Sequence, residues 1–199
     1  NSPVEIAADY AVENGINFVV AAGNSGTLGP NSVGIPASAK NVITVGAVDD
    51  GLDIAYFSSR GPTKDGRLKP EVSAVGVDVT SSFPGNGYQT WSGTSMATPH
   101  VAGFVALLLE KNPSLSPEQV KKLLTDSALD KGIPGPDNDY GYGVVNGLET
   151  LVYVNPLQHE VSLGKLDLKN YLILNEETKI NLDLKNYGIN SENVEVKLF

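Results

Sequence analysis

Ser95 lies where a hydroxyl could act as a nucleophile. It is the third residue of the run Gly93-Thr94-Ser95-Met96-Ala97-Thr98-Pro99-His100-Val101-Ala102-Gly103. The residues that follow it predict a long apolar helix. The first N–H groups of a helix have no partner within the helix and give its start a positive potential. This position suits a serine whose reaction passes through an oxyanion, although serine is also a common helix N-cap.

A serine nucleophile needs a base, which is usually a histidine oriented by a carboxylate. The sequence has two histidines, His100 and His159. His100 follows Ser95 by five residues, which rotates it about 140° around a helix axis, so we expect the two side chains to point apart. His159 belongs to a predicted β segment and is expected at the surface. Neither histidine is expected to serve as the base.

A second polar residue stands at the end of a predicted strand. Residues 17–22 form a short, apolar and β-branched run that is typical of a buried parallel strand, and the loop Gly23-Asn24-Ser25-Gly26 follows it. Ligands bind at the carboxyl ends of strands in open α/β sheets. Asn24 is therefore a candidate donor to an oxyanion, whereas the alternative is an ordinary turn asparagine.

The run around Ser95 resembles the active-serine segment of the subtilisin-like serine peptidases, the subtilases. Phe18-Val19-Val20-Ala21-Ala22-Gly23-Asn24-Ser25-Gly26 resembles their oxyanion-hole segment, and the resemblance extends over roughly residues 1–152 through the further runs Val42-Ile43-Thr44-Val45-Gly46-Ala47, Phe57-Ser58-Ser59-Arg60-Gly61-Pro62 and Tyr140-Gly141-Tyr142-Gly143-Val144-Val145-Asn146. It implies that Ser95 is the nucleophile and that the Asn24 side chain and the Ser95 N–H hold the oxyanion. It also implies a set of substrate-binding residues: Ala21, Ala22, Gly23, Gly93 and Thr94.

Subtilases carry their triad in the order Asp, His, Ser. The sequence contains no Asp-Ser-Gly, Asp-Thr-Gly or His-Gly-Thr-His run. We therefore expect residues 1–154 to be the C-terminal portion of a catalytic domain, inactive alone, whose partner is the N-terminal half of the protease. The alternatives are a non-catalytic binding module from a degenerate protease, and an unrelated serine esterase whose base would have to be His100 or His159.

Composition excludes several other classes of function. The 199 residues carry a net charge of −9, which disfavours nucleic-acid binding, and there is no cysteine for thiol or metal chemistry. The longest apolar stretch, Val101 to Leu109, is far shorter than the roughly 17 to 25 residues of a membrane span. The resemblance implies a protein or peptide substrate and a secreted or cell-surface location.

No cofactor is expected for the chemistry, and no side-chain metal site is predicted. Asp137-Asn138-Asp139 lacks the spaced glycine and glutamate of a calcium loop. The resemblance does imply that structural calcium could bind to backbone carbonyls of the segment from Ala37 to Val42.

The sequence predicts an α/β fold, with a partial subtilisin-like parallel sheet and flanking helices, followed by a short antiparallel β segment. Helices are expected over residues 3–14, 95–111, 116–127 and 147–152, and strands over 17–22, 42–48, 54–57, 72–74, 77–82 and 88–92. The helix from Ser95 is apolar nearly all round and is expected to be central and buried, with Pro99 in its first turn. An Asn86-Gly87 turn is expected before residue 88.

The character of the chain changes at Asn155-Pro156. Alternating runs at 161–163, 172–174, 179–184 and 194–199, with a turn at Asn186-Tyr187-Gly188, predict antiparallel strands. We expect residues 155–199 to be the start of a truncated β-sandwich domain.

Overall fold

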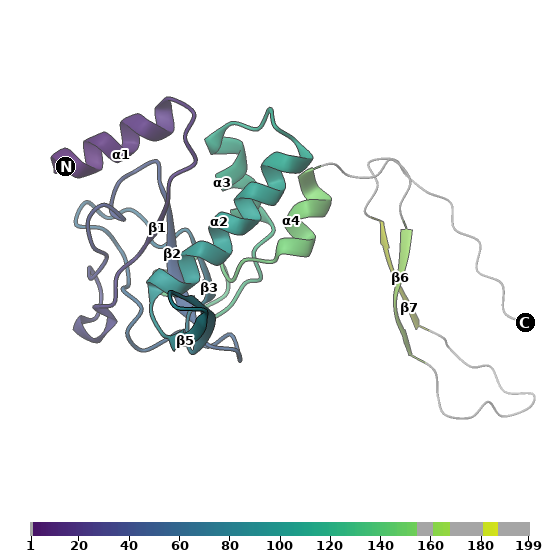
Figure 1. Ribbon diagram of the computed structural model, residues 1–199. Helices are drawn as coiled ribbons and strands as arrows, with labels where there is room; N and C mark the ends of the chain where they lie inside the picture. The colour runs from purple at the N-terminus through teal and green to yellow at the C-terminus, as the bar shows by residue number, and fades with distance from the viewer. Residues whose placement is uncertain (1, 155–160, 168–180, 187–199) are drawn as a thin grey trace, which may run out of the picture. The chain divides into compact units, whose positions relative to one another are not determined.

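The centre of the fold is β2 (Ile43–Val48), in which every residue is buried. The computed structural model describes residues 2–154, 161–167 and 181–186. In it β2 pairs in parallel with β1 (Val19–Ala21) on one side and with β3 (Val72–Val75) on the other (Figure 1). This arrangement confirms the predicted parallel sheet. The prediction rested on the apolar, β-branched residues that are typical of parallel strands buried on both faces.

Helices cover both faces of this sheet. α2 (Thr94–Lys111) contacts all three strands, and its buried side chains share one apolar cluster with Val19. α1 (Pro3–Glu13) packs through Ala8 against Phe18 and Val20. Successive side chains of a strand point to opposite faces, so α1 and α2 lie on opposite sides of the sheet (Figure 1).

The helix starts agree with their predicted caps. The Ser2 hydroxyl accepts a hydrogen bond from the Glu5 N–H at 3.3 Å, and the Glu5 carboxylate accepts one from the Ser2 N–H. Ser116 and Gln119 form the same reciprocal pair at the start of α3 (Pro117–Asp126). These bonds satisfy N–H groups that have no partner within the helix. A fourth helix, α4 (Gly147–Val154), ends the first part of the chain.

The predicted hairpin is present, but its turn is displaced. β4 (Val79–Phe83) pairs in antiparallel fashion with β5 (Gly87–Trp91), and the Phe83–Gly87 pair leaves residues 84–86 as the loop. Gly85 and Asn86 adopt φ angles of 91° and 61°, so the turn lies one residue before the predicted Asn86-Gly87 position. The strand predicted at 54–57 is reduced to an isolated bridge between Ile54 and Val48.

The structure corrects two expectations about α2. Its buried residues are Thr94, Ala97, Val101, Val105 and Leu108, whereas Ala102, Gly103, Ala106 and Leu107 are exposed. The helix is therefore buried on one side only, and an apolar strip on its other side faces solvent. Pro99 is the sixth helical residue rather than part of the first turn, so it supplies no N–H to the carbonyl of Ser95.

The chain divides into two units, Asn1–Val154 and Asn155–Phe199. In the second unit β6 (Val161–Asp167) pairs in antiparallel fashion with β7 (Asn181–Asn186). His159, the runs at 172–174 and 194–199, and most of the predicted turn at Asn186 lie outside the described residues. The sandwich domain therefore stays a prediction. In the described part of the chain, the helices are all too short or too polar to cross a membrane.

Replacing Glu5 with Gln should lower the free energy of unfolding at pH 7 by about 1 kcal/mol, because two hydrogen bonds to a carboxylate are weakened. The Ser2 N–H and then the Ser38 hydroxyl lower the pKa of Glu5 below 4.5. As the pH falls, Glu5 is protonated in the unfolded chain before it is protonated in the folded protein. The stabilisation by its carboxylate is therefore lost as the pH drops through the lowered pKa of the folded protein.

Thermal unfolding at neutral pH and at about pH 3 measures this effect, and a Glu110→Gln variant on the exposed part of α2 is the control. If the Glu5→Gln substitution lowered the melting temperature equally at both pH values, the stabilising role of the Glu5 carboxylate would be contradicted.

Candidate active site

Ser95 is the second residue of α2 and is exposed to solvent. Its backbone N–H lies in the first turn, where no carbonyl of the helix can accept it. Within residues 2–154 neither this N–H nor the Ser95 hydroxyl has a hydrogen-bond partner. Both groups are therefore available at the positive end of the helix, as the sequence predicts.

Asn24 follows the carboxyl end of β1, and its side chain is bound to the start of α2. Its Oδ1 accepts hydrogen bonds from the Thr94 N–H at 2.9 Å and from the Thr94 hydroxyl at 3.0 Å. A backbone N–H can only donate, so the atom that faces it must be the amide oxygen. This contact fixes the orientation of the amide, and the Asn24 NH₂ group is left to donate elsewhere.

Thr94 is buried, and its hydroxyl joins the two segments. It donates to Asn24 and accepts a hydrogen bond from the Gly23 N–H at 3.2 Å. Gly93, also buried, lies beside the amide, because a Cβ at this position would stand 3.2 Å from Asn24 Nδ2. Thr94 and Gly93 therefore set the position of Asn24, and their substrate-binding role stays a prediction.

The loop that carries Asn24 is held by Ser59, a residue that no local pattern in the sequence singles out. The Ser59 N–H donates to the Gly23 carbonyl at 2.9 Å, and the Ser59 hydroxyl accepts from the Ser25 N–H at 3.0 Å. Gly23 has a φ of 111°, and a Cβ there would approach the Ser59 hydroxyl to 2.9 Å. Only glycine combines this backbone conformation with this close contact.

The remaining predicted pocket residues end the strand. Ala21 is half-buried, whereas Ala22 is fully buried. The Ala22 N–H donates to the Val45 carbonyl, and its own carbonyl accepts from the Gly34 N–H, each at 2.9 Å. Both polar backbone groups of Ala22 are thus used within the protein. The substrate-binding role of these residues stays a prediction.

Two open cavities flank the site. One, of about 420 Å³, is lined by Ser95, Met96 and His100 of α2 and by residues of the β4–β5 hairpin that include Phe83 and Trp91. The other, of about 580 Å³, is lined by Asn24 together with residues 54–57. Ser95 and Asn24 therefore each border open space.

His100 lines the same cavity as Ser95, but no hydrogen bond joins the two side chains. The His100 Nδ1 lies 3.0 Å from the carbonyl oxygen of Met96, one helical turn earlier. His100 is thus bonded within its own helix, and the expectation that it is not the base for Ser95 stays a prediction.

Comparison with known proteins gives a consistent result. The protein-family model described as Subtilase family matches residues 1–143. Subtilisin DY of Bacillus licheniformis is 46% identical over 70% of this chain and 48% of its own length. Serine protease AprX of Bacillus subtilis (strain 168) is 42% identical over 72% of this chain and 37% of its own length. This chain thus spans half or less of these curated relatives.

A solved structure of the self-cleaved protease domain of PatA superposes with a TM-score of 0.66 and 31% identity. The match covers 77% of this chain and 56% of that one. It supports the subtilisin-like α/β architecture described above.

A Thr94→Val variant keeps the shape of the side chain but removes the hydroxyl that bonds Gly23 and Asn24. We expect the free energy of unfolding to fall by about 1–3 kcal/mol, because a partly buried N–H loses its acceptor. A Thr94→Ser variant retains the hydroxyl and is the matched control. Thermal unfolding measures the difference, and equal stability of the two variants would refute the contact.

Proposed function

The chain belongs to the subtilase family, and we propose that it forms the part of a serine endopeptidase that supplies the nucleophile and the oxyanion site. The observation that supports this proposal most directly is the double hydrogen bond between Thr94 and Asn24 Oδ1. It turns the NH₂ group of Asn24 away from the bond and keeps it next to the start of the helix that carries Ser95. The family implies protein or peptide substrates.

In the proposed reaction, Ser95 Oγ attacks the carbonyl carbon of the scissile peptide bond, and a base takes the hydroxyl proton. The carbonyl oxygen becomes an oxyanion, which accepts hydrogen bonds from the Asn24 NH₂ group and the Ser95 N–H. The C–N bond then breaks, and the base returns its proton to the leaving amine. Water attacks the remaining ester and releases the acid, regenerating the Ser95 hydroxyl.

We propose that the base and its carboxylate come from polypeptide outside these 199 residues. His100 is bonded to the Met96 carbonyl, and it is the only histidine in the part of the chain that the structure describes. In this proposal the chain is the C-terminal portion of the catalytic domain.

Two exposed features support such a partner. The strip Ala102, Gly103, Ala106 and Leu107 of α2 is apolar and open to solvent. β1 pairs only with β2 among the described strands, so its outer backbone groups form an edge that another strand could pair with. We propose that the N-terminal half of the protease covers both features and brings the histidine to Ser95.

We also propose that the protein is secreted or located at the cell surface, as its membership of the subtilase family leads us to expect.

A fluorophosphonate probe should label Ser95 strongly only when the polypeptide that carries the base is present, because the unassisted hydroxyl is a weak nucleophile. The chain alone should hydrolyse peptides at a negligible rate. Intact mass and peptide mapping identify the labelled residue, with Ser95→Ala as the negative control. Efficient labelling of the chain alone that is lost in a His100→Ala variant would instead support an esterase that uses His100.

Replacing Asn24 in the assembled protease with Leu, which has a similar size and cannot donate, should lower kcat by about 10²–10³-fold with little change in KM. The reason for the lower kcat is that the hydrogen bond lost with the NH₂ group forms only as the oxyanion develops. The loss of the Oδ1 acceptor for Thr94 should in addition lower the stability of the protein. Ser25→Ala, which alters an exposed residue of the same loop, is the control. An Asn24→Leu enzyme with an unchanged kcat would favour a non-catalytic module or a different oxyanion donor.

A further inference from the structure

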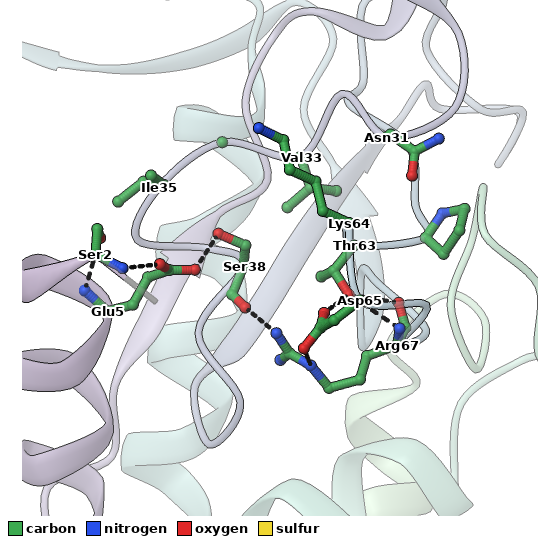
Figure 2. A pocket seen from close by; sticks show the side chains of 12 residues that line it. Ser2, Glu5, Asn31, Val33, Ile35, Ser38, Thr63, Lys64, Asp65 and Arg67 are labelled. Atoms are coloured by element: carbon green, nitrogen blue, oxygen red, sulfur yellow. Dashed lines mark hydrogen bonds and ion pairs between the residues drawn. The ribbon is translucent and has the colours of Figure 1, made fainter.

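The segment from Ala37 to Val42 connects the loop after Asn24 to β2, and its neighbours include many charged side chains. Ser38, near the start of the segment, is one of the residues that line a cavity of about 540 Å³ (Figure 2). There the Ser38 hydroxyl donates to Glu5 at 2.7 Å, and the Ser38 carbonyl accepts from Arg67 Nη2 at 2.9 Å (Figure 2). Arg67 is held in turn by Asp65 at 2.9 Å.

Other carbonyl groups of this segment also accept hydrogen bonds from side chains of the protein. The Ala37 carbonyl accepts from the Thr44 hydroxyl at 2.6 Å. The Lys40 and Val42 carbonyls accept from Lys121 Nζ of α3 at 3.2 and 3.1 Å. The Val42 carbonyl also accepts from Lys69 Nζ at 3.4 Å. The Ser38, Lys40 and Val42 carbonyls thus each face a cationic side chain, and the Ala37 carbonyl faces a hydroxyl.

Two of these cations, Lys69 and Lys121, meet at the buried carboxylate of Glu71. Lys69 Nζ lies 2.7 and 2.9 Å from the two carboxylate oxygens of Glu71 and 3.0 Å from the Thr44 hydroxyl. Lys121 Nζ lies 2.8 Å from Glu71 Oε1, and the Thr44 N–H donates to Glu71 Oε2 at 2.8 Å. Only 1% of the Lys69 side chain is exposed. The cluster thus holds two ammonium groups and one carboxylate.

Lys69 remains a cation at neutral pH. Burial lowers the pKa of Lys69 from 10.5 to about 8, against the opposing effect of the Glu71 charge. A buried ammonium is retained where it is paired and hydrogen-bonded, as it is here.

The oxygen atoms of this segment do not fit a calcium ion. Calcium takes about six to eight oxygen ligands, usually with carboxylates among them. Here the Val42 carbonyl and the Glu71 carboxylate already face ammonium groups, which a divalent cation would have to displace. The Asp9 carboxylate is also occupied, because it accepts hydrogen bonds from the Lys40 and Asn41 N–H groups. Within the described residues, no group of three or more His, Cys, Asp or Glu side chains is placed to bind a metal.

We propose that Lys69, Lys121 and Arg67 take the place of a metal ion in this protein: their side chains hold the carbonyl groups of the Ala37–Val42 segment, and the segment does not bind calcium. In this arrangement lysine and arginine side chains link the Ala37–Val42 segment to the rest of the fold. Glu71 and Thr44 provide the link to the sheet, and Lys121 provides the link to α3. This role is independent of the function proposed for Ser95.

Amide ¹⁵N–¹H spectra of the full chain test the proposal locally. Calcium titrated to about 10 mM, above the Kd of weak calcium sites, should leave the resonances of residues 37–42 and 44 unchanged. A saturable shift of these resonances in the wild-type protein would overturn the proposal, wherever else calcium binds.

A Lys69→Met variant tests the same claim through stability. Met fills the space of the alkyl chain but removes a donor that Glu71, Thr44 and Val42 share. The buried carboxylate then loses one of its two ammonium partners, so the melting temperature should fall by more than about 5 °C. Lys64→Met, which changes an exposed lysine at the rim of the cavity in Figure 2, is the matched control. Equal melting temperatures for the two variants would overturn the proposal. If Lys69→Met does not fold, the calcium titration of the wild-type protein decides alone.

Discussion

One oxygen atom, Asn24 Oδ1, determines the geometry of the candidate site. It accepts two hydrogen bonds from Thr94, a residue 70 positions away in the sequence. An amide that is held through its oxygen must present its NH₂ group on the other side. The start of α2 and the end of β1 are thereby locked together, and the two groups that could hold an oxyanion belong to the two locked segments.

The surroundings explain why this contact is well defined. β1 ends beside the fully buried β2, and the loop after β1 is fixed by Ser59 on one side and by Thr94 on the other. Further along the same connection, Arg67, Lys69 and Lys121 fix the Ala37–Val42 segment that leads into β2. The site is therefore built on a rigid strand end and not on a free loop, which is what a preorganised oxyanion site requires.

Features that depend on neighbouring residues could be predicted from local patterns, whereas contacts between distant residues could be predicted only where the family resemblance supplied them, as for Asn24 beside the start of α2. The cap at Ser2 involves residues three positions apart, and the apolar run of β2 carries its own burial signal. The role of Ser59 depends on a contact across 34 residues that no local pattern encodes. The apolar residues of α2 indicate a helix that can be buried all round, but they do not indicate whether a partner covers its second side. Likewise, the carbonyls of Ala37–Val42 give no sign in the sequence that lysines far along the chain reach them.

In the proposed reaction the Ser95 oxygen and the Asn24 NH₂ group act on the same carbonyl. A crystal structure of the assembled protease with a peptidyl boronic acid would locate both groups, because the boronate forms a tetrahedral adduct with a nucleophilic serine. We expect a bond from boron to Ser95 Oγ and a boronate oxygen within hydrogen-bonding distance of both Asn24 Nδ2 and the Ser95 N–H. An adduct on another residue, or one whose oxygens lie away from Asn24, would contradict the proposed reaction.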